Sequence, residues 1–95
     1  LRFIDMATDR IKPVADVIVV SAGFDTSTRE RKDLFEDDPN AAGWEKFGLT
    51  EDCYYKIGQK LRQTELPILA VQEGGYNINY LGQDVVSFLH GLAGK

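Results

Sequence analysis

Two short apolar runs constrain the fold of this chain more than any other feature. They read VADVIVVS at 14–21 and LPILAV at 66–71, and continuous runs of this length are typical of strands covered on both faces, as in parallel sheets. Helical periodicity lies before the first run, between the two runs and after the second. This order predicts an α/β fold in which parallel strands are joined by right-handed crossovers, with helices on both faces of the sheet.

Three segments carry the helical patterns. The first dozen residues are amphipathic, and Pro13 ends their pattern. The second segment begins at Thr50, whose hydroxyl suits a helix cap, and Glu51 and Asp52 favour the positive end of the helix dipole. It runs to about Gln63, and the third segment closes the chain. The apolar positions are Leu1, Ile4, Ala7 and Ile11 in the first helix, Cys53, Ile57 and Leu61 in the second, and Leu81, Val85, Phe88, Leu89 and Leu92 in the third.

The chain is small for the fold that it predicts. Its 95 residues form at most one domain with a thin core, and two parallel strands are too few for a stable sheet alone. The sequence also opens on Leu1, inside a pattern that is already helical. We therefore expect residues 1–95 to be one part of a single, larger α/β domain.

Composition excludes several classes of function. The net charge of −4 comes from 15 acidic and 11 basic residues, so a nucleic-acid backbone is not an expected partner. No apolar run approaches the roughly 20 residues of a membrane-spanning helix. Cys53 is the single cysteine, which rules out an internal disulfide and favours a reducing compartment such as the cytoplasm. Cys53 itself, on an apolar helix stripe, is expected to be a core residue.

Two irregular loops, at 22–49 and 72–80, follow the two predicted strands. The carboxyl ends of parallel strands meet at one edge of a sheet, where ligands of α/β proteins bind. The second loop contains Gly74, Gly75 and Tyr76. A phenol is a neutral hydrogen-bond donor at pH 7, so Tyr76 is a candidate for stabilising an oxyanion, and the glycines would let a substrate approach the backbone closely. The alternative is an aromatic side chain that only packs over a glycine turn.

The first loop is rich in carboxylates, which suit divalent cations and can complete a zinc site if imidazoles come from elsewhere. The alternative is a solvated acidic loop. The single histidine, His90, lies in the closing helix, far from this edge, and is expected to be structural or surface-exposed. The candidate carboxylates are Asp25, Asp33, Glu36, Asp37 and Asp38.

Four segments together resemble the carboxyl-terminal part of the histone deacetylase superfamily, and most of all its bacterial and archaeal members grouped with the acetylpolyamine amidohydrolases. They are VIVVSAGFD at 17–25, DDP at 37–39, FGLTEDCYYKIG at 47–58 and LPILAVQEGGYN at 66–77. The resemblance extends over nearly the whole chain and follows the family's order. The strand with SAGFD and the strand with EGGY are specific as a pair, although either alone would be a weak signal.

The resemblance implies an arginase/deacetylase-like parallel sheet with a zinc ion at its carboxyl edge. The family's zinc is held by two aspartates and a histidine, of which this chain would supply one aspartate, Asp38. The other two ligands belong to an upstream Asp-x-His motif that this chain lacks. Tyr76 would polarise the scissile amide carbonyl opposite the zinc, and Gly74 and Gly75 would let the acyl-amine tunnel pass close to the backbone.

One departure from the family pattern concerns the metal ligand. The two loop aspartates of the family lie five positions apart, whereas Asp25 and Asp38 lie thirteen apart in this sequence. An insertion before DDP explains the difference, but Glu30, Asp33 and Asp37 remain alternative ligands. Asp25 is expected to be a structural carboxylate that bonds backbone amides of the metal loop.

The resulting hypothesis is part of a zinc-dependent amidohydrolase that removes acyl groups from acetyl-lysine or acetylpolyamine. The family's general-base histidines also lie upstream, so these 95 residues alone are expected to be inactive. The alternative is a non-catalytic α/β module for ligand binding or interaction, in which the acidic loop is solvated and Tyr76 merely packs. Neither the substrate nor the oligomeric state follows from the sequence.

Overall fold

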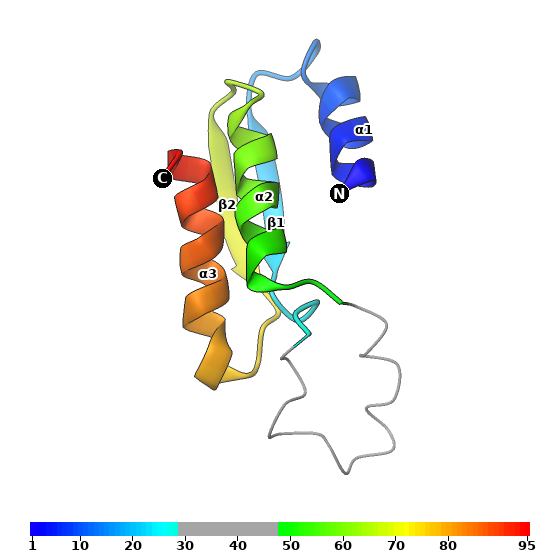
Figure 1. Cartoon of the computed structure of the whole chain (residues 1–95). Helices are drawn as coiled ribbons and strands as arrows, with labels where there is room; N and C mark the ends of the chain where they lie inside the picture. The colour runs from blue at the N-terminus through cyan, green and yellow to red at the C-terminus, as the bar shows by residue number, and fades with distance from the viewer. Residues whose placement is uncertain (29–47) are drawn as a thin grey trace.

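The computed structural model of the chain describes residues 1–28 and 48–95. Helices and strands alternate along it, as predicted (Figure 1). They are α1 (Arg2–Ile11), β1 (Ile18–Gly23), α2 (Glu51–Arg62), β2 (Ile68–Glu73) and α3 (Ile78–Ala93). Each overlaps a segment that the sequence assigns to the same type. Both strands end two residues later than predicted, at Gly23 and Glu73, and α3 begins at Ile78, inside the predicted loop 72–80.

The two strands form a parallel pair with α2 as the crossover between them. The register runs from Ile18 opposite Ile68 to Gly23 opposite Glu73. The predicted α/β class with a parallel sheet is thus confirmed. Both strands run in the same direction, so both of the loops that follow them leave from one end of the sheet (Figure 1).

The core lies between the inner face of the sheet and the two helices α2 and α3, which pack against each other. Phe24, just beyond β1, is at its centre. Its ring centroid lies 5.1 Å from that of Tyr54 on α2 and 5.9 Å from that of Phe88 on α3. Tilted and edge-on arrangements of this kind contribute beyond the apolar area that they bury. In the described part of the chain, the buried apolar residues are Ile18, Phe24, Tyr54, Leu61 and Phe88.

The outer face of the sheet is apolar and open to solvent in the described part of the chain. Val19 and its register partner Leu69 are 63% and 57% exposed, and Val17 and Val71 on the same face are also exposed. The apolar runs led us to expect cover on both faces. The described helices α2 and α3 cover only one, because they pack against each other on the same side.

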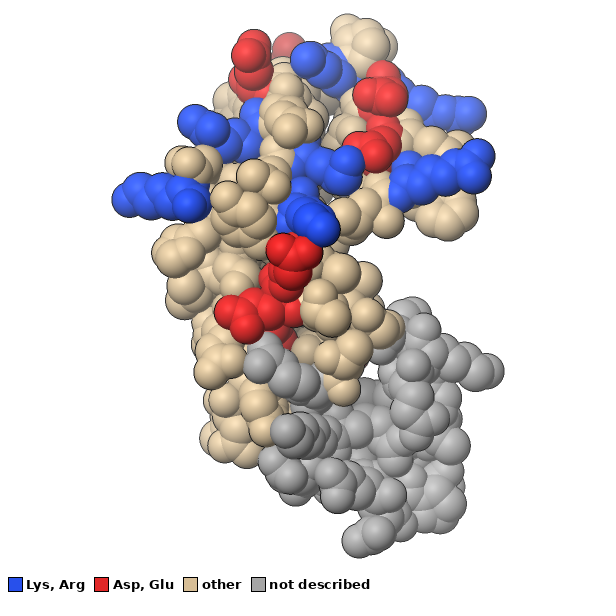
Figure 2. Space-filling view, in the orientation of Figure 1, with Lys and Arg blue, Asp and Glu red and all other residues tan. Residues whose placement is uncertain are grey.

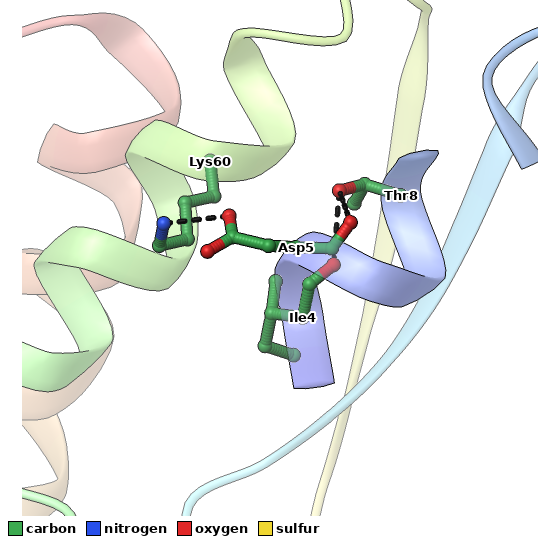
Figure 3. Close-up of polar contacts among 4 residues, drawn as sticks. All are labelled: Ile4, Asp5, Thr8 and Lys60. Carbon is green, nitrogen blue, oxygen red and sulfur yellow. Dashed lines mark hydrogen bonds and ion pairs between the residues drawn. The ribbon is translucent and has the colours of Figure 1, made fainter. Parts of the chain in front are cut away.

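The first helix stands apart from the sheet and touches α2 (Figure 1). Its contact includes an ion pair in which Lys60 Nζ lies 2.6 Å from Asp5 Oδ1 (Figure 3). Thr8 is the buried side chain of α1, and its hydroxyl donates to the Ile4 carbonyl at 2.9 Å. The apolar stripe predicted for this helix is largely unburied, since Leu1 and Ile11 are 42% and 37% exposed and Ala7 is exposed. A partly exposed ion pair contributes about 1 kcal/mol at most, so α1 is the most weakly attached element described.

No helix in residues 1–28 and 48–95 is long and apolar enough to cross a membrane.

The contact between α2 and α3 depends on two glycines, Gly58 and Gly91. A Cβ on Gly58 would meet the Phe88 carbonyl oxygen and lie 2.8 Å from the Leu92 nitrogen. A Cβ on Gly91 would meet the Tyr55 carbonyl oxygen and lie 2.9 Å from the Gln59 nitrogen. These neighbours are backbone atoms of the facing helix and cannot rotate away. The helices can approach this closely only without side chains at 58 and 91.

We predict that Gly58→Ala and Gly91→Ala destabilise the protein by about 1–3 kcal/mol each, the usual effect of overpacking a tight contact. Gly82→Ala is the matched control in α3. A Cβ there meets nothing within 4 Å, so the better helix propensity of alanine should stabilise by up to about 1 kcal/mol. Thermal and urea unfolding of the complete protein measure all three. Equal effects at positions 82 and 91 would contradict the close helix contact.

Candidate functional site

Two loops lie side by side at the carboxyl end of the sheet (Figure 1). One follows β1 from Phe24 onward, and the other follows β2 from Gly74 onward. They are joined by a hydrogen bond in which the Phe24 backbone N–H donates to the Gly74 carbonyl at 2.9 Å. This bond continues the ladder one residue past the strands. The structure therefore brings the SAGFD and EGGY motifs together at one edge, as predicted.

The side chain of Asp25 lies against Gly74. An ideal Cβ on Gly74 would lie 2.7 Å from both Cγ and Oδ2 of Asp25, and one on Gly23 would lie 3.1 Å from Asp25 Oδ1. The carboxylate thus occupies the space above the glycines at the ends of both strands. We expected Asp25 to bond backbone amides of its own loop, but between the described residues no hydrogen bond of this carboxylate is found. Its described contact is with the loop of the other strand.

Position 75, the second glycine of the pair, requires glycine for two reasons. Its φ is 123°, in the region that residues with a Cβ rarely adopt. A Cβ would also lie 2.8 Å from Leu81 Cδ1 and 3.0 Å from Phe24 Cβ. Gly74 and Gly75, proposed from the sequence to admit a substrate, are thus both needed to seat the loop against its neighbours.

Tyr76 follows at the surface of this edge and is 60% exposed. Asn77, only 1% exposed, caps α3, and its side-chain oxygen accepts from the Asn79 N–H at 3.2 Å. Tyr76 therefore stands between a backbone that packing holds in place and a capped helix start. A phenol in this position is accessible to a ligand at the carboxyl edge.

Sequence reasoning did not identify Tyr54, which supports the first loop from below. This residue is 3% exposed, and its hydroxyl shares a 2.9 Å hydrogen bond with the Thr26 hydroxyl. The Tyr54 hydroxyl also donates to the Phe24 carbonyl at 3.5 Å. Its helical position, one residue from the apolar stripe, was the available signal, but only the fold places its hydroxyl beneath the loop.

The acidic segment between the first loop and α2 begins and ends at this same edge. Ser27 and Leu49 form a parallel bridge, in which the Thr28 N–H donates to the Leu49 carbonyl at 2.9 Å and the Leu49 N–H to the Thr26 carbonyl at 3.0 Å. The candidate ligands within the segment lie outside the described residues. They are Glu30, Asp33, Glu36, Asp37 and Asp38.

The charge at the described part of this edge is negative. Residues 23–28, 48–52 and 73–80 contain Asp25, Glu51, Asp52 and Glu73 and no lysine or arginine. In Figure 2 the lysine and arginine side chains of the described residues gather over the end of the molecule away from the loops. The first basic residue on α2 is Lys56, whose Nζ lies 2.8 Å from Asp52 Oδ2. The described part of the edge therefore carries a net negative charge.

The described residues contain no group of three His, Cys, Asp or Glu side chains that could hold a metal ion. His90 lies exposed in the last turn of α3, at the opposite end of that helix from the loops. It is thus surface-exposed, in agreement with one of the two roles expected for it. A metal at the edge would need a ligand from the acidic segment together with ligands from elsewhere.

Cys53 lies near the start of α2 and is half-buried, so it is less enclosed than the core position expected for it. Thr50, the cap of this helix, donates from its hydroxyl to Cys53 Sγ at 3.3 Å and accepts from the Cys53 N–H at 3.4 Å. The hydrogen bonds of Thr50 lower the pKa of the Cys53 thiol below its ordinary value, because they favour the thiolate.

Comparison with known proteins gives the family. The family described as "Histone deacetylase domain" matches residues 2–92. The chain belongs to this family. It is 36% identical over 91 residues to the acetylpolyamine amidohydrolase of Mycoplana ramosa, covering 92% of this chain and 23% of that protein. It is also 39% identical over 80 residues to a probable deacetylase of Methanothermobacter thermautotrophicus, covering 84% of this chain and 20% of that protein.

A third relative is acetylpolyamine amidohydrolase 1 of Pseudomonas aeruginosa, 32% identical over 92 residues, which are 96% of this chain and 23% of that protein. The chain therefore spans between a fifth and a quarter of the length of these relatives. The family resemblance drawn from the paired loop motifs is confirmed.

We predict that the Cys53 thiol reacts with iodoacetamide at lower pH than a free cysteine. Below its pKa a thiol is protonated and unreactive, so a lowered pKa moves the midpoint of the rate profile downward. Thr50→Val removes the hydroxyl and should return the midpoint toward the ordinary value. Mass spectrometry of alkylation between pH 6 and 10 measures this, with Thr28→Val as the control. An unchanged midpoint in Thr50→Val would contradict the role of the cap.

Proposed function

We propose that this chain is part of a zinc-dependent amidohydrolase that removes acetyl or related acyl groups from an amine. The observation that carries the proposal is the meeting of the two loops: Tyr76 is exposed at the edge where the acidic segment begins and ends. Membership of the histone deacetylase domain family supports a hydrolase, and its named relatives include amidohydrolases of acetylpolyamines.

Tyr76 is the proposed catalytic residue of the chain. Its phenol would donate a hydrogen bond to the oxygen of the scissile amide as negative charge develops there. A donor set in place before the reaction stabilises that charge without reorganisation. The loop ends at the amino end of α3, whose positive dipole end favours the same charge. Gly74 and Gly75 would let the acyl group pass close to the backbone.

The metal contribution of this chain is proposed to be one carboxylate, Asp38, with Asp37, Asp33 and Glu30 as alternatives. Carboxylate oxygen fits a zinc site that imidazole nitrogen completes, and the acidic segment leaves and rejoins the fold at the edge that carries Tyr76. When bound, zinc would supply Lewis acidity toward the carbonyl and lower the pKa of water. The remaining ligands and the general base would come from outside these residues, so the 95 residues alone are expected to be inactive.

The proposed substrate is an acylated amine, and the charge of the edge favours an acetylpolyamine over acetyl-lysine in a protein. An acetylpolyamine keeps further ammonium groups, which the negative edge would attract. Two of the relatives above are named for acetylpolyamine. A reducing compartment such as the cytoplasm is part of the same proposal, because the single cysteine allows no internal disulfide.

We predict that Tyr76→Phe lowers kcat of the complete protein on an acetylpolyamine by about 10²–10³-fold, the usual loss when one oxyanion donor is removed. The ring remains, so the variant should still fold. Tyr55→Phe is the matched control, because the contact described for its hydroxyl lies on α2, where it accepts from Gln59 Nε2 at 3.3 Å. Steady-state kinetics and circular dichroism test both variants. Full activity in Tyr76→Phe would overturn the assignment.

We predict that a chelator abolishes activity and that added zinc restores it. Asp38→Ala should lower both the bound zinc, measured by elemental analysis, and the activity by at least tenfold, since a site that loses one of its ligands binds metal weakly. Asp37→Ala, Asp33→Ala and Glu30→Ala are the neighbouring controls, and whichever variant loses zinc identifies the ligand. A folded complete protein that holds no zinc and cleaves no acyl amine would instead be a non-catalytic module.

A further inference from the structure

We propose that Asp25 is a positioning residue for Tyr76. This inference rests on the proposed function, because it concerns how Tyr76 is held in place for its work. Asp25 lies at the end of β1, on the loop that faces the one carrying Tyr76. Its described contact, with Gly74, is made by a carboxylate at a distance that leaves no room for a side chain on the facing loop.

The contact begins where the strand ladder ends. The Phe24 N–H donates to the Gly74 carbonyl at 2.9 Å, so the two loops begin at the same level along the strand direction. The next residue after Phe24 is Asp25, and its carboxylate fills the space that a Cβ on Gly74 would take. The carboxylate therefore limits how far the second loop can move toward β1.

The second loop is also held from its other side. Gly75 lies against Phe24 Cβ and Leu81 Cδ1, so closely that neither leaves space for a Cβ. The backbone at 74 and 75 is thus confined between Asp25 and the inner core. Tyr76 directly follows this backbone and is 60% exposed. A shift of the backbone at 74 and 75 would therefore move the phenol with it.

Asp25 is itself held in place. The residue before it is in the core, and the residue after it, Thr26, shares a 2.9 Å hydrogen bond with the buried hydroxyl of Tyr54. The backbone that carries the Asp25 carboxylate is therefore held by α2 and the core, which makes it a stable support for the neighbouring loop. A displacement of about 1 Å in a catalytic group can lower a rate by about 10²-fold, so a rigid support matters here.

The test compares Asp25→Ala with Asp25→Asn in the complete protein. Asp25→Ala removes the group that lies on Gly74 and should lower kcat on an acetylpolyamine by about tenfold to 10²-fold, with KM changed far less. Asp25→Asn keeps the shape and should retain activity within about threefold. Asp16→Ala, an exposed carboxylate at the opposite end of the sheet, is the control. Equal losses in Asp25→Ala and Asp25→Asn would overturn the proposal, because a shape-based contact survives the conservative change.

A double-mutant comparison with Tyr76→Phe separates positioning from general support of the fold. If Asp25 acts through the phenol, Asp25→Ala should cause no further loss of kcat in the Tyr76→Phe background. If the double variant loses kcat by the product of the two single losses, Asp25 does not act through the phenol. That result would overturn the positioning role but not the proposed function. If Tyr76→Phe is itself fully active, the proposed function fails, and this outcome is visible before Asp25 is changed.

The steric contact is tested from the other side by Gly74→Ala. Its Cβ would overlap the Asp25 carboxylate, so this variant should lose more activity than Asp25→Ala. In the double variant Asp25→Ala/Gly74→Ala the new methyl takes the vacated space, and activity should rise at least threefold above Gly74→Ala alone. A double variant no better than Gly74→Ala would contradict the contact. Circular dichroism of each variant distinguishes a misfolded protein from a folded one in which the loop carrying Tyr76 is displaced.

Discussion

The hydrogen bond from the Phe24 N–H to the Gly74 carbonyl joins the core of this protein to its candidate site. The same residue places its ring between Tyr54 and Phe88, on the two helices that cover the sheet. One residue thus anchors the core through its side chain and the second loop through its backbone. Because burial of an aromatic ring is among the larger contributions to a small core, the packing of α2 and α3 also supports the geometry of the two loops.

The loops that meet at this bond have opposite chemical characters. The loop after β2 is short, glycine-rich and confined, and it ends at a capped helix. The loop after β1 leads into a long acidic segment, whose two ends are paired through Ser27 and Leu49. Confinement suits the role proposed for Tyr76, a hydrogen-bond donor that must not move. Carboxylates suit a cation, whether a metal ion or the ammonium groups of a polyamine.

The uncovered face of the sheet is a second consequence of the architecture. Val19 and Leu69 lie opposite each other and are more than half exposed. Parallel sheets are stable when both faces are covered, and apolar surface removed from water contributes about 25 cal/mol per Å². The outer face therefore favours a further layer of protein. The relatives of this chain, four to five times as long as the segment that matches it, have ample chain for such a layer.

The sequence by itself determined the element types, the parallel class and the meeting of the SAGFD and EGGY motifs at one edge. Periodicity, the Thr50 cap and the glycine pair are local signals, and the topology of a β-α-β unit then places both loops together. Only the tertiary structure decided which surfaces are covered. The apolar stripe of α1 and the outer face of the sheet look like core in a sequence, since burial depends on neighbours from distant parts of a chain. The contact of Asp25 with Gly74 and the hydroxyl of Tyr54 beneath the first loop have the same origin, because they join residues 49 and 28 positions apart, which no local pattern can pair.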